Sequence, residues 1–158
     1  MHIGFIGFGL IGGSIARAVR AGGPSSGWTM SAWSPSGEGP RHAAADGIVD
    51  RAAASAEAAM ADADLVVLAG PATACVTVLG ELDGPWRTVL PPRAVITDVA
   101  STKLMLLERA DAAGLRYVGG HPMAGLEANG YDAARADLFV DRPWVIVPGR
   151  VAEPVDVE

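Results

Sequence analysis

The sequence predicts an α/β protein built on a doubly wound, mainly parallel sheet. Apolar runs of strand length alternate with segments of helical spacing along the whole chain, as in βαβ units. The runs at 64–69 and 94–99 are largely continuous, which is expected of central parallel strands covered on both faces. A glycine-rich turn, GFGLIGG, joins the apolar run at 2–6 directly to the first helical segment. This order of strand, glycine turn and helix places the chain in the α/β class.

The individual elements follow from these patterns in chain order. Helical spacing begins at Ile11 and ends at the Gly-Gly-Pro stop, and the Gly/Pro/Ser stretch at 22–27 predicts a loop between helix and strand. Another helix is expected between Lys103 and Gly114. Strands are predicted at 2–6, 28–33, 64–69, 94–99, 116–118 and 144–147, and short helices at 41–46 and 55–61. We expect one domain over 1–150, while 151–158 predicts an acidic tail or the opening of a further helical domain.

Composition excludes several classes of protein. The chain has 158 residues and a net charge of −6, without a cluster of basic residues, so nucleic acid is not expected as a partner. It contains no apolar run of the ~18 residues that a membrane-spanning helix needs. Cys75 is the only cysteine, which excludes an internal disulfide and a cysteine zinc site, and fits the cytoplasm. We expect no metal.

The glycine turn is a candidate dinucleotide site. In the pattern Gly7-x-Gly9-x-x-Gly12, the first glycine permits the tight turn, the second lets a pyrophosphate approach, and the third allows close packing of helix on strand. The free N–H groups of Leu10, Ile11 and Gly12 would then face the phosphates at the helix N-terminus. This context favours a Rossmann-type cofactor site over a glycine turn that binds nothing.

The residues after the second strand bear on the choice of cofactor. An acidic residue there would bind the ribose 2′-hydroxyl of NAD. The sequence instead offers the hydroxyls of Ser34 and Ser36, with Arg41 a few residues on. We therefore expect NADP in preference to NAD, although Arg41 could simply be solvated.

Polar residues gather where the later strands end. Because ligands bind beyond the carboxyl ends of parallel strands, we expect Ser101, Lys103 and His121 to meet in one crevice. A neutral imidazole accepts protons near pH 7, so His121, in a turn narrowed by glycines, is the candidate catalytic base. Gly70, Pro71 and Asp98, at two neighbouring strand ends, are assigned to the cofactor. Ser101 could also cap the following helix, and Lys103 could be an exposed lysine.

Four segments resemble the prephenate/arogenate dehydrogenases of tyrosine biosynthesis: GFGLIGGSIARA, DVASTK, GGHPMAGLEANG and ARADLF followed by Trp144. The resemblance covers residues 2–148 and implies oxidative decarboxylation of a cyclohexadienol, with hydride passing to NAD(P)+. It implies that His121 and Ser101 act at the ring hydroxyl, Lys103 orients the crevice, and Glu127 lies at the substrate mouth.

Two departures from this family leave alternatives open. Leu126 stands where a small hydroxyl residue is common, which also fits a dehydrogenase of an amino-substituted prephenate analogue. The family's helical dimerisation domain, with the arginine that binds the substrate side chain, has no counterpart within 1–158. A homodimer is expected where that domain follows. A non-catalytic dinucleotide-binding module is the second alternative.

Overall fold

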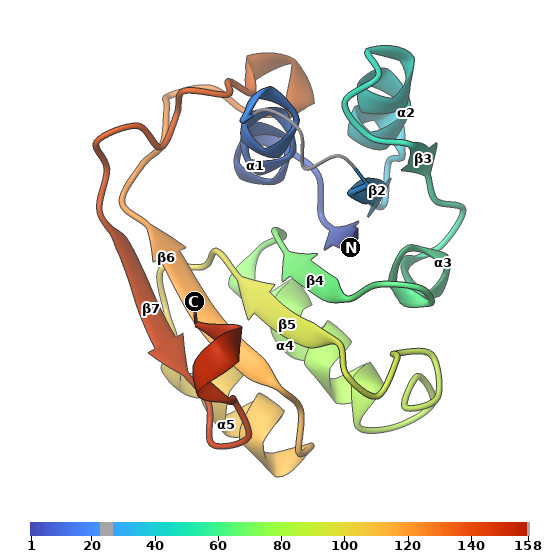
Figure 1. Ribbon diagram of the computed structural model, residues 1–158, viewed down its shortest axis with the longest axis vertical. Coiled ribbons are helices and arrows are strands. Elements are labelled where there is room, and N and C mark those ends of the chain that lie inside the picture. Colours follow the sequence, from blue (N-terminus) through green and yellow to red (C-terminus); the bar gives the residue numbers. More distant parts are fainter. Residues whose placement is uncertain (23–26, 158) are drawn as a thin grey trace.

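The computed structural model describes residues 1–22 and 27–157, so residues 23–26 of the expected 22–27 loop lie outside the described part. One seven-stranded sheet runs through the molecule in the order β3-β2-β1-β4-β5-β6-β7 (Figure 1). All neighbouring pairs are parallel except β6 and β7, which are antiparallel. The strands are β1 (His2–Ile6), β2 (Thr29–Trp33), β3 (Arg51–Ala52), β4 (Leu65–Leu68), β5 (Val95–Asp98), β6 (Tyr117–Pro122) and β7 (Trp144–Pro148).

Helices cover both faces of the sheet, which confirms the predicted fold class. One face carries α1 (Leu10–Ala21), α2 (Glu38–Ala45) and the short 3-10 helix η1 (Tyr131–Ala133). The other carries α3 (Ala56–Met60), α4 (Ala72–Leu82) and α5 (Leu104–Ala112). In Figure 1, α1 and α4 accordingly lie on opposite sides of β4.

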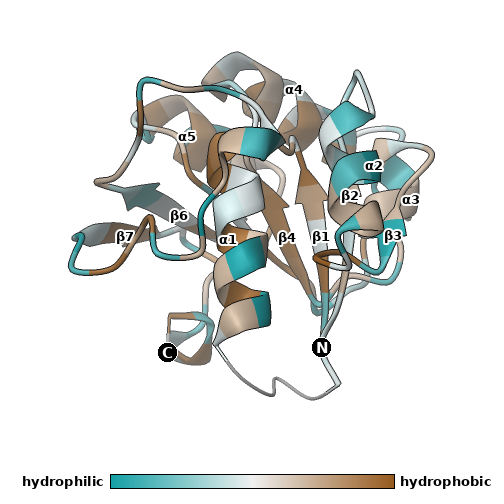
Figure 2. Ribbon diagram, turned by 90° about the horizontal axis from the view of Figure 1, so that it is seen from above, coloured by the Kyte–Doolittle hydropathy of each residue, from teal (hydrophilic) through white to brown (hydrophobic). Residues whose placement is uncertain are grey.

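Each face has its own hydrophobic core because strand side chains alternate between faces. In β1, Ile3 and Phe5 face α1 and α2, while Ile6 faces the other three helices. The apolar central strands β1 and β4 stand out in brown in Figure 2. Phe5 and Leu68 are fully buried, and burial of one such side chain stabilises the fold by about 1.5–3 kcal/mol.

The structure corrects several expected elements. The segment Ala72–Leu82 is helix α4, which was not predicted, and the two-residue strand β3 was not predicted either. Helix α2 begins at Glu38, three residues before the expected start at Arg41. Strand β6 continues to Pro122, so His121 lies within a strand and not in a turn after it. Antiparallel pairing with β7 provides the hydrogen bonds that extend β6.

Residues 130–135, the crossing segment, return from β6 to pack on the first helix. The Tyr131 ring stacks on Phe8 at 5.6 Å between centroids, and the guanidinium of Arg17 lies 4.5 Å from the same ring. The Tyr131 hydroxyl donates to Asp46 at 2.8 Å, and burial raises the pKa of this phenol. A side chain at Gly13 would lie 2.8 Å from the Tyr131 ring, so glycine is needed there. The middle of the connection between β6 and β7 is therefore fixed beside the glycine turn.

Residues 151–157 fold back onto the body of the domain. They contain the 3-10 helix η2 (Pro154–Asp156), whose Asp156 pairs with Arg116, the residue just before β6. Glu153 lies 3.5 Å from the same guanidinium. Within the described ranges, no helix is both long and apolar enough to cross a bilayer.

Candidate active site

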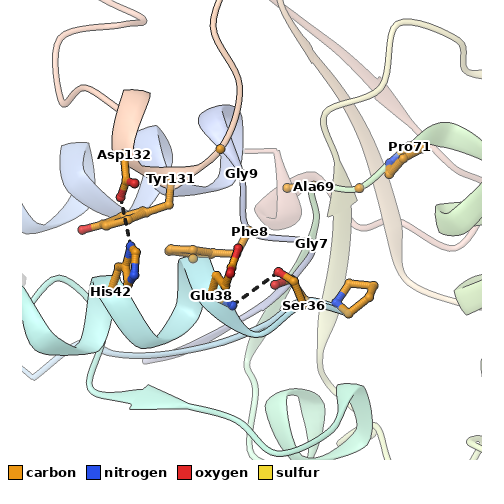
Figure 3. Close-up of a pocket in the computed structure, with 15 residues that line it drawn as sticks. Gly7, Phe8, Gly9, Ser36, Glu38, His42, Ala69, Pro71, Tyr131 and Asp132 are labelled. Carbon is orange, nitrogen blue, oxygen red and sulfur yellow. Dashed lines mark hydrogen bonds and ion pairs between the residues drawn. The ribbon is translucent and has the colours of Figure 1, made fainter.

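A cavity of about 400 Å³ opens beside the glycine turn (Figure 3). Its wall is formed by the turn itself, the loop after β2, the start of α2, the loop after β4 and the crossing segment. Gly70 and Pro71, predicted to contact a cofactor, lie in this wall. The lining residues used below are Gly7, Phe8, Gly9, Ser34, Ser36, Glu38, His42 and Asp132.

The glycines of the turn meet the steric demands that the sequence predicted. Gly7 has φ +86°, and a side chain there would lie 2.5 Å from the backbone nitrogen of Gly70. At Gly12, a side chain would lie 3.0 Å from the Gly7 carbonyl oxygen, because α1 packs closely on β1. Both positions therefore exclude larger residues.

Gly9 differs from the other two because no protein atom lies within 4 Å of where its side chain would be. Gly9 is also the N-cap of α1, and no side chain caps this helix. The N–H groups of Leu10, Ile11 and Gly12 thus stay available at the positive end of the helix dipole, beside open space. This arrangement fits a pyrophosphate, as the dinucleotide prediction requires.

Replacing Gly9 by alanine tests this assignment. We expect weaker binding of nicotinamide dinucleotide, on the order of tenfold or more, because the methyl group projects into the pyrophosphate space. The melting temperature should change little, since the methyl group meets no protein atom. Gly125→Ala is the matched control, because Gly125 is also unobstructed but does not line the glycine-turn cavity. Equal nucleotide affinity in the two variants would contradict the assignment.

The three residues behind the NADP prediction lie around the loop that follows β2. Ser34 and Ser36 line the glycine-turn cavity, and they also line a second cavity, of about 360 Å³, together with Arg41 and the segment 52–54. Its guanidinium nitrogen Nη2 lies 3.4 Å from the Ser36 carbonyl oxygen. Arg41 therefore does not line the glycine-turn cavity, but it shares the second cavity with both serines of the prediction.

A carboxylate that the sequence reasoning overlooked borders the same pocket. Glu38, the first residue of α2, lines the cavity with Ser36, so the premise that no acid lies near this site is corrected. Asp132 of the crossing segment forms a second acidic wall and pairs with His42 at 3.0 Å (Figure 3). Gly37 is the N-cap of α2 and has a positive φ. A helix predicted to begin directly after Gly37 would have included Glu38.

An apolar cavity of about 340 Å³ adjoins the glycine pocket and shares Gly7, Pro35, Gly70 and Pro71 with it. Two tryptophans, Trp33 and Trp86, are among its other lining residues. Its size and character suit a flat aromatic ring system such as adenine.

Asp98 is fully buried, and its carboxylate accepts hydrogen bonds from the Lys103 ammonium, the Tyr117 hydroxyl and the Ala100 amide. The predicted contact of Asp98 with a cofactor is therefore corrected, because the carboxylate is committed to groups of the protein. Burial, together with the bond to Asp98, raises the pKa of Tyr117, so its hydroxyl remains a donor. The side chain of Lys103 is 15% exposed, which also rejects the reading of an exposed lysine.

The paired glycines before His121 make room for this network and for β7. A side chain at Gly119 would lie 2.9 Å from the Lys103 stem. One at Gly120 would lie 2.6 Å from the Asp98 carbonyl oxygen and 2.9 Å from the Trp144 indole nitrogen. Since alternate residues of a strand share a face, His121 projects from the same face as Gly119, where Lys103 lies. The structure thus brings Lys103 and His121 to one face at the end of β6.

The other predicted site residues lie nearer the surface. Ser101 is exposed after β5, and α5 begins after Lys103 without a side-chain cap, so Ser101 is not the N-cap of this helix. Glu127 is exposed in the loop between β6 and the crossing segment. Throughout 1–22 and 27–157, no hydrogen bond to the His121 ring is found, and the ring is half-buried.

The family model described as prephenate dehydrogenase, nucleotide-binding domain, matches residues 15–158. The chain belongs to this family. The resemblance predicted from the motifs is therefore confirmed.

Known members of the prephenate dehydrogenase family share the fold over nearly the whole chain. The prephenate dehydrogenase of Bacillus subtilis (strain 168) is 34% identical over 155 residues, which cover 96% of this chain and 40% of that protein. The crystal structure of Synechocystis arogenate dehydrogenase is 33% identical with a TM-score of 0.84, covering 99% of this chain and 53% of that one. The A. aeolicus prephenate dehydrogenase in complex with hydroxyphenyl propionate and NAD+ is 25% identical with a TM-score of 0.86, covering 99% and 54%. The chain spans about half the length of these relatives, or less.

A further cavity, of about 300 Å³, lies beside the loop that follows His121 in this family member. Leu126, Arg135 and Arg142 are among its lining residues. Asp137 binds Arg135 through two contacts, at 2.9 and 2.7 Å, and so neutralises it. Arg142 is exposed and forms no ion pair with the residues described.

Proposed function

We propose that this chain is the nucleotide-binding part of an NAD(P)-dependent dehydrogenase that oxidatively decarboxylates prephenate or arogenate in tyrosine biosynthesis. The observation that carries the proposal is the combination of an open, uncapped glycine turn with a strand that presents His121 at the same edge of the sheet. Membership of the prephenate dehydrogenase nucleotide-binding family supports the substrate class.

Residues of the glycine turn would hold the cofactor. The amides of Leu10, Ile11 and Gly12 face the space for the pyrophosphate, and the apolar cavity at Trp33 and Trp86 suits the adenine. The bound nicotinamide would supply the acceptor for the hydride that leaves the ring carbon of the substrate.

The protein's own contribution is the handling of one proton and of charge. As the hydride leaves the carbinol carbon, His121 accepts the proton of the hydroxyl on that carbon. Loss of CO2 then makes the ring aromatic, and the phenolate oxygen takes this proton back. Ser101 hydrogen-bonds the same hydroxyl. Lys103, whose ammonium is paired with the Asp98 carboxylate, orients the crevice on the His121 face. Glu127 borders the mouth of the crevice.

The remaining assignments concern the wider protein. A small molecule is the expected partner, and the fit of a single buried thiol to a reducing compartment supports a cytoplasmic location. A homodimer is proposed where the helical dimerisation domain of the family follows this domain. If residues 1–158 themselves bind the substrate side chain, Arg142, which forms no ion pair with the part of the chain that the structure describes, is the first candidate.

One observation favours a second candidate substrate. Leu126 is 44% exposed and lines the cavity beyond His121, so it presents an apolar group where the family commonly has a hydroxyl. An amino-substituted prephenate analogue is therefore an alternative to prephenate and arogenate.

Steady-state kinetics test the proposal. Reduced nicotinamide, detected by absorbance, and released CO2 should form in equal amounts with prephenate or arogenate. The amino-substituted analogue, tested in the same assay, decides between the substrates. Ser101→Ala should reduce turnover without changing nucleotide affinity. Tight nucleotide binding with no turnover on any of the three, in a chain extended to the length of its relatives, would instead identify a non-catalytic binding module.

A further inference from the structure

We propose that the cavity between residues 123–126 and 135–142, the loop cavity, binds a small organic acid whose carboxylate lies on the guanidinium of Arg142. This cavity of about 300 Å³ shares no lining residue with the cavity at the glycine turn. It is therefore a second binding site and not a part of the cofactor site. Binding of the acid does not depend on the proposed dehydrogenase activity, which only supplies one source of such a ligand.

The loop cavity carries one positive charge that the described protein does not balance. Arg135 and Asp137 both line it, but they bind each other through contacts of 2.9 and 2.7 Å, so their charges cancel. Arg142 also lines it, and its guanidinium forms no ion pair within residues 1–22 and 27–157. A guanidinium presents a planar fork of donors that matches a carboxylate, so an anion is the ligand that complements this cavity.

The facing wall offers backbone donors to the same anion. The amides of Ala124, Gly125 and Leu126 donate to no acceptor in the part of the chain that the structure describes. A side chain at Gly125 would meet no protein atom within 4 Å, so the backbone is open to a ligand here, as it is at Gly9. Free N–H groups of successive residues form anion sites in proteins, and here they lie in one cavity with a guanidinium.

Backbone hydrogen bonds hold both walls in place before a ligand binds. The Arg142 amide donates to the Phe139 carbonyl oxygen at 3.1 Å, and Asp141 between them has φ +57°, a turn conformation that aspartate tolerates. The Met123 amide donates to the Pro143 carbonyl oxygen at 2.9 Å, which joins the two walls directly beside Arg142. Because the backbone is already fixed, little ordering of it has to accompany binding.

Apolar side chains around the charged groups indicate what kind of acid fits. Met123, Leu126 and Val140 line the loop cavity and are 46%, 44% and 63% exposed. Inorganic phosphate would leave these side chains in water, whereas an acid with a short apolar body would cover them. Two sources offer such a group: the carboxylate side chain of the substrate, or a separate organic acid.

Calorimetric titration with phenylpropionate tests the inference. This probe has a carboxylate and an apolar ring but no hydroxyl for His121. Arg142→Met should weaken its binding by about tenfold or more, the order expected of a lost charge-assisted contact. Gly125→Ala should weaken it as well, because the methyl group projects into the open space beside the free amides. The uncharged amide of the same acid should bind far more weakly than the acid.

Arg93→Met is the matched control, because it removes an exposed arginine that does not line the loop cavity. It should leave the affinity for phenylpropionate unchanged, which excludes an effect of net charge alone. Equal affinity in the parent and in Arg142→Met would overturn the inference. Titration of the same samples with NAD+ and NADP+ reports on the proposed function separately, so the failure of one is distinguishable from the failure of the other.

Kinetics with a form of the protein that turns over prephenate or arogenate distinguish the two sources of the acid. If the substrate side chain occupies the loop cavity, Arg142→Met should raise KM with little change in kcat, and phenylpropionate should compete with the substrate. If a separate acid occupies it, KM should stay the same in Arg142→Met and phenylpropionate should not compete. Either pattern supports the site when the titration depends on Arg142.

Discussion

Replacing His121 by alanine is expected to lower turnover by about 10²–10⁴-fold, the usual effect of removing a positioned proton acceptor. Nucleotide affinity should remain unchanged, because His121 lies on β6 and does not line the cavity at the glycine turn. The measurement pairs steady-state kinetics on prephenate and arogenate with calorimetric titration of the cofactor, using a form of the protein that turns over one of these substrates.

Chemical rescue distinguishes lost chemistry from lost structure in this variant. Added imidazole should restore part of the turnover of His121→Ala, because the space left by the ring lies at the surface end of a strand. A variant that keeps most of the parent activity would exclude His121 as the proton acceptor.

Replacing Lys103 by methionine is expected to destabilise the domain by about 3–5 kcal/mol, the usual cost of leaving a buried charge without its partner. Asp98 is fully buried, and the methionine retains most of the stem that packs over Gly119 while removing the ammonium. Denaturant unfolding monitored by tryptophan fluorescence gives the free energy of unfolding directly.

Two further variants control this result. Adding Asp98→Asn to Lys103→Met should recover part of the loss, because the amide removes the unpaired charge. Arg150→Met removes an arginine whose side chain is 88% exposed from its 3.5 Å pair with Asp111, and should cost at most about 1 kcal/mol. If the free energy of unfolding fell as little in Lys103→Met as in Arg150→Met, water or another cation would have to reach the Asp98 carboxylate.

Much of this fold could be predicted because its strands are apolar and its turns carry glycine. Helix α4 was overlooked because β-branched residues such as Val76 and Thr77 are poor indicators of a helix. Its buried positions Cys75, Val78 and Leu79 do follow helical spacing. The parallel pairing of β4 with β5 also requires a crossover at this place.

The site was predictable where chemistry depends on local sequence and not where it depends on distant contacts. The roles of Gly7 and Gly12 follow from the turn alone. Asp98 is different, because its partner Tyr117 lies 19 residues away and only the folded sheet joins them. The direction in which Arg41 turns likewise depends on a backbone oxygen that no pattern reveals.

The crossing segment binds the later part of the chain to the first helix, so the domain does not consist of two separable halves. The backbone amide of Arg135 donates a hydrogen bond to the Ser14 hydroxyl oxygen at 3.0 Å, and this contact spans 121 residues of sequence. The loop that carries Glu127 is consequently tethered at both ends, by β6 and by the glycine-turn helix. The length of this loop is therefore constrained by the gap that it spans. Amide hydrogen exchange should therefore show α1 and residues 131–135 opening together, as one cooperative unit formed by two segments that are far apart in the sequence.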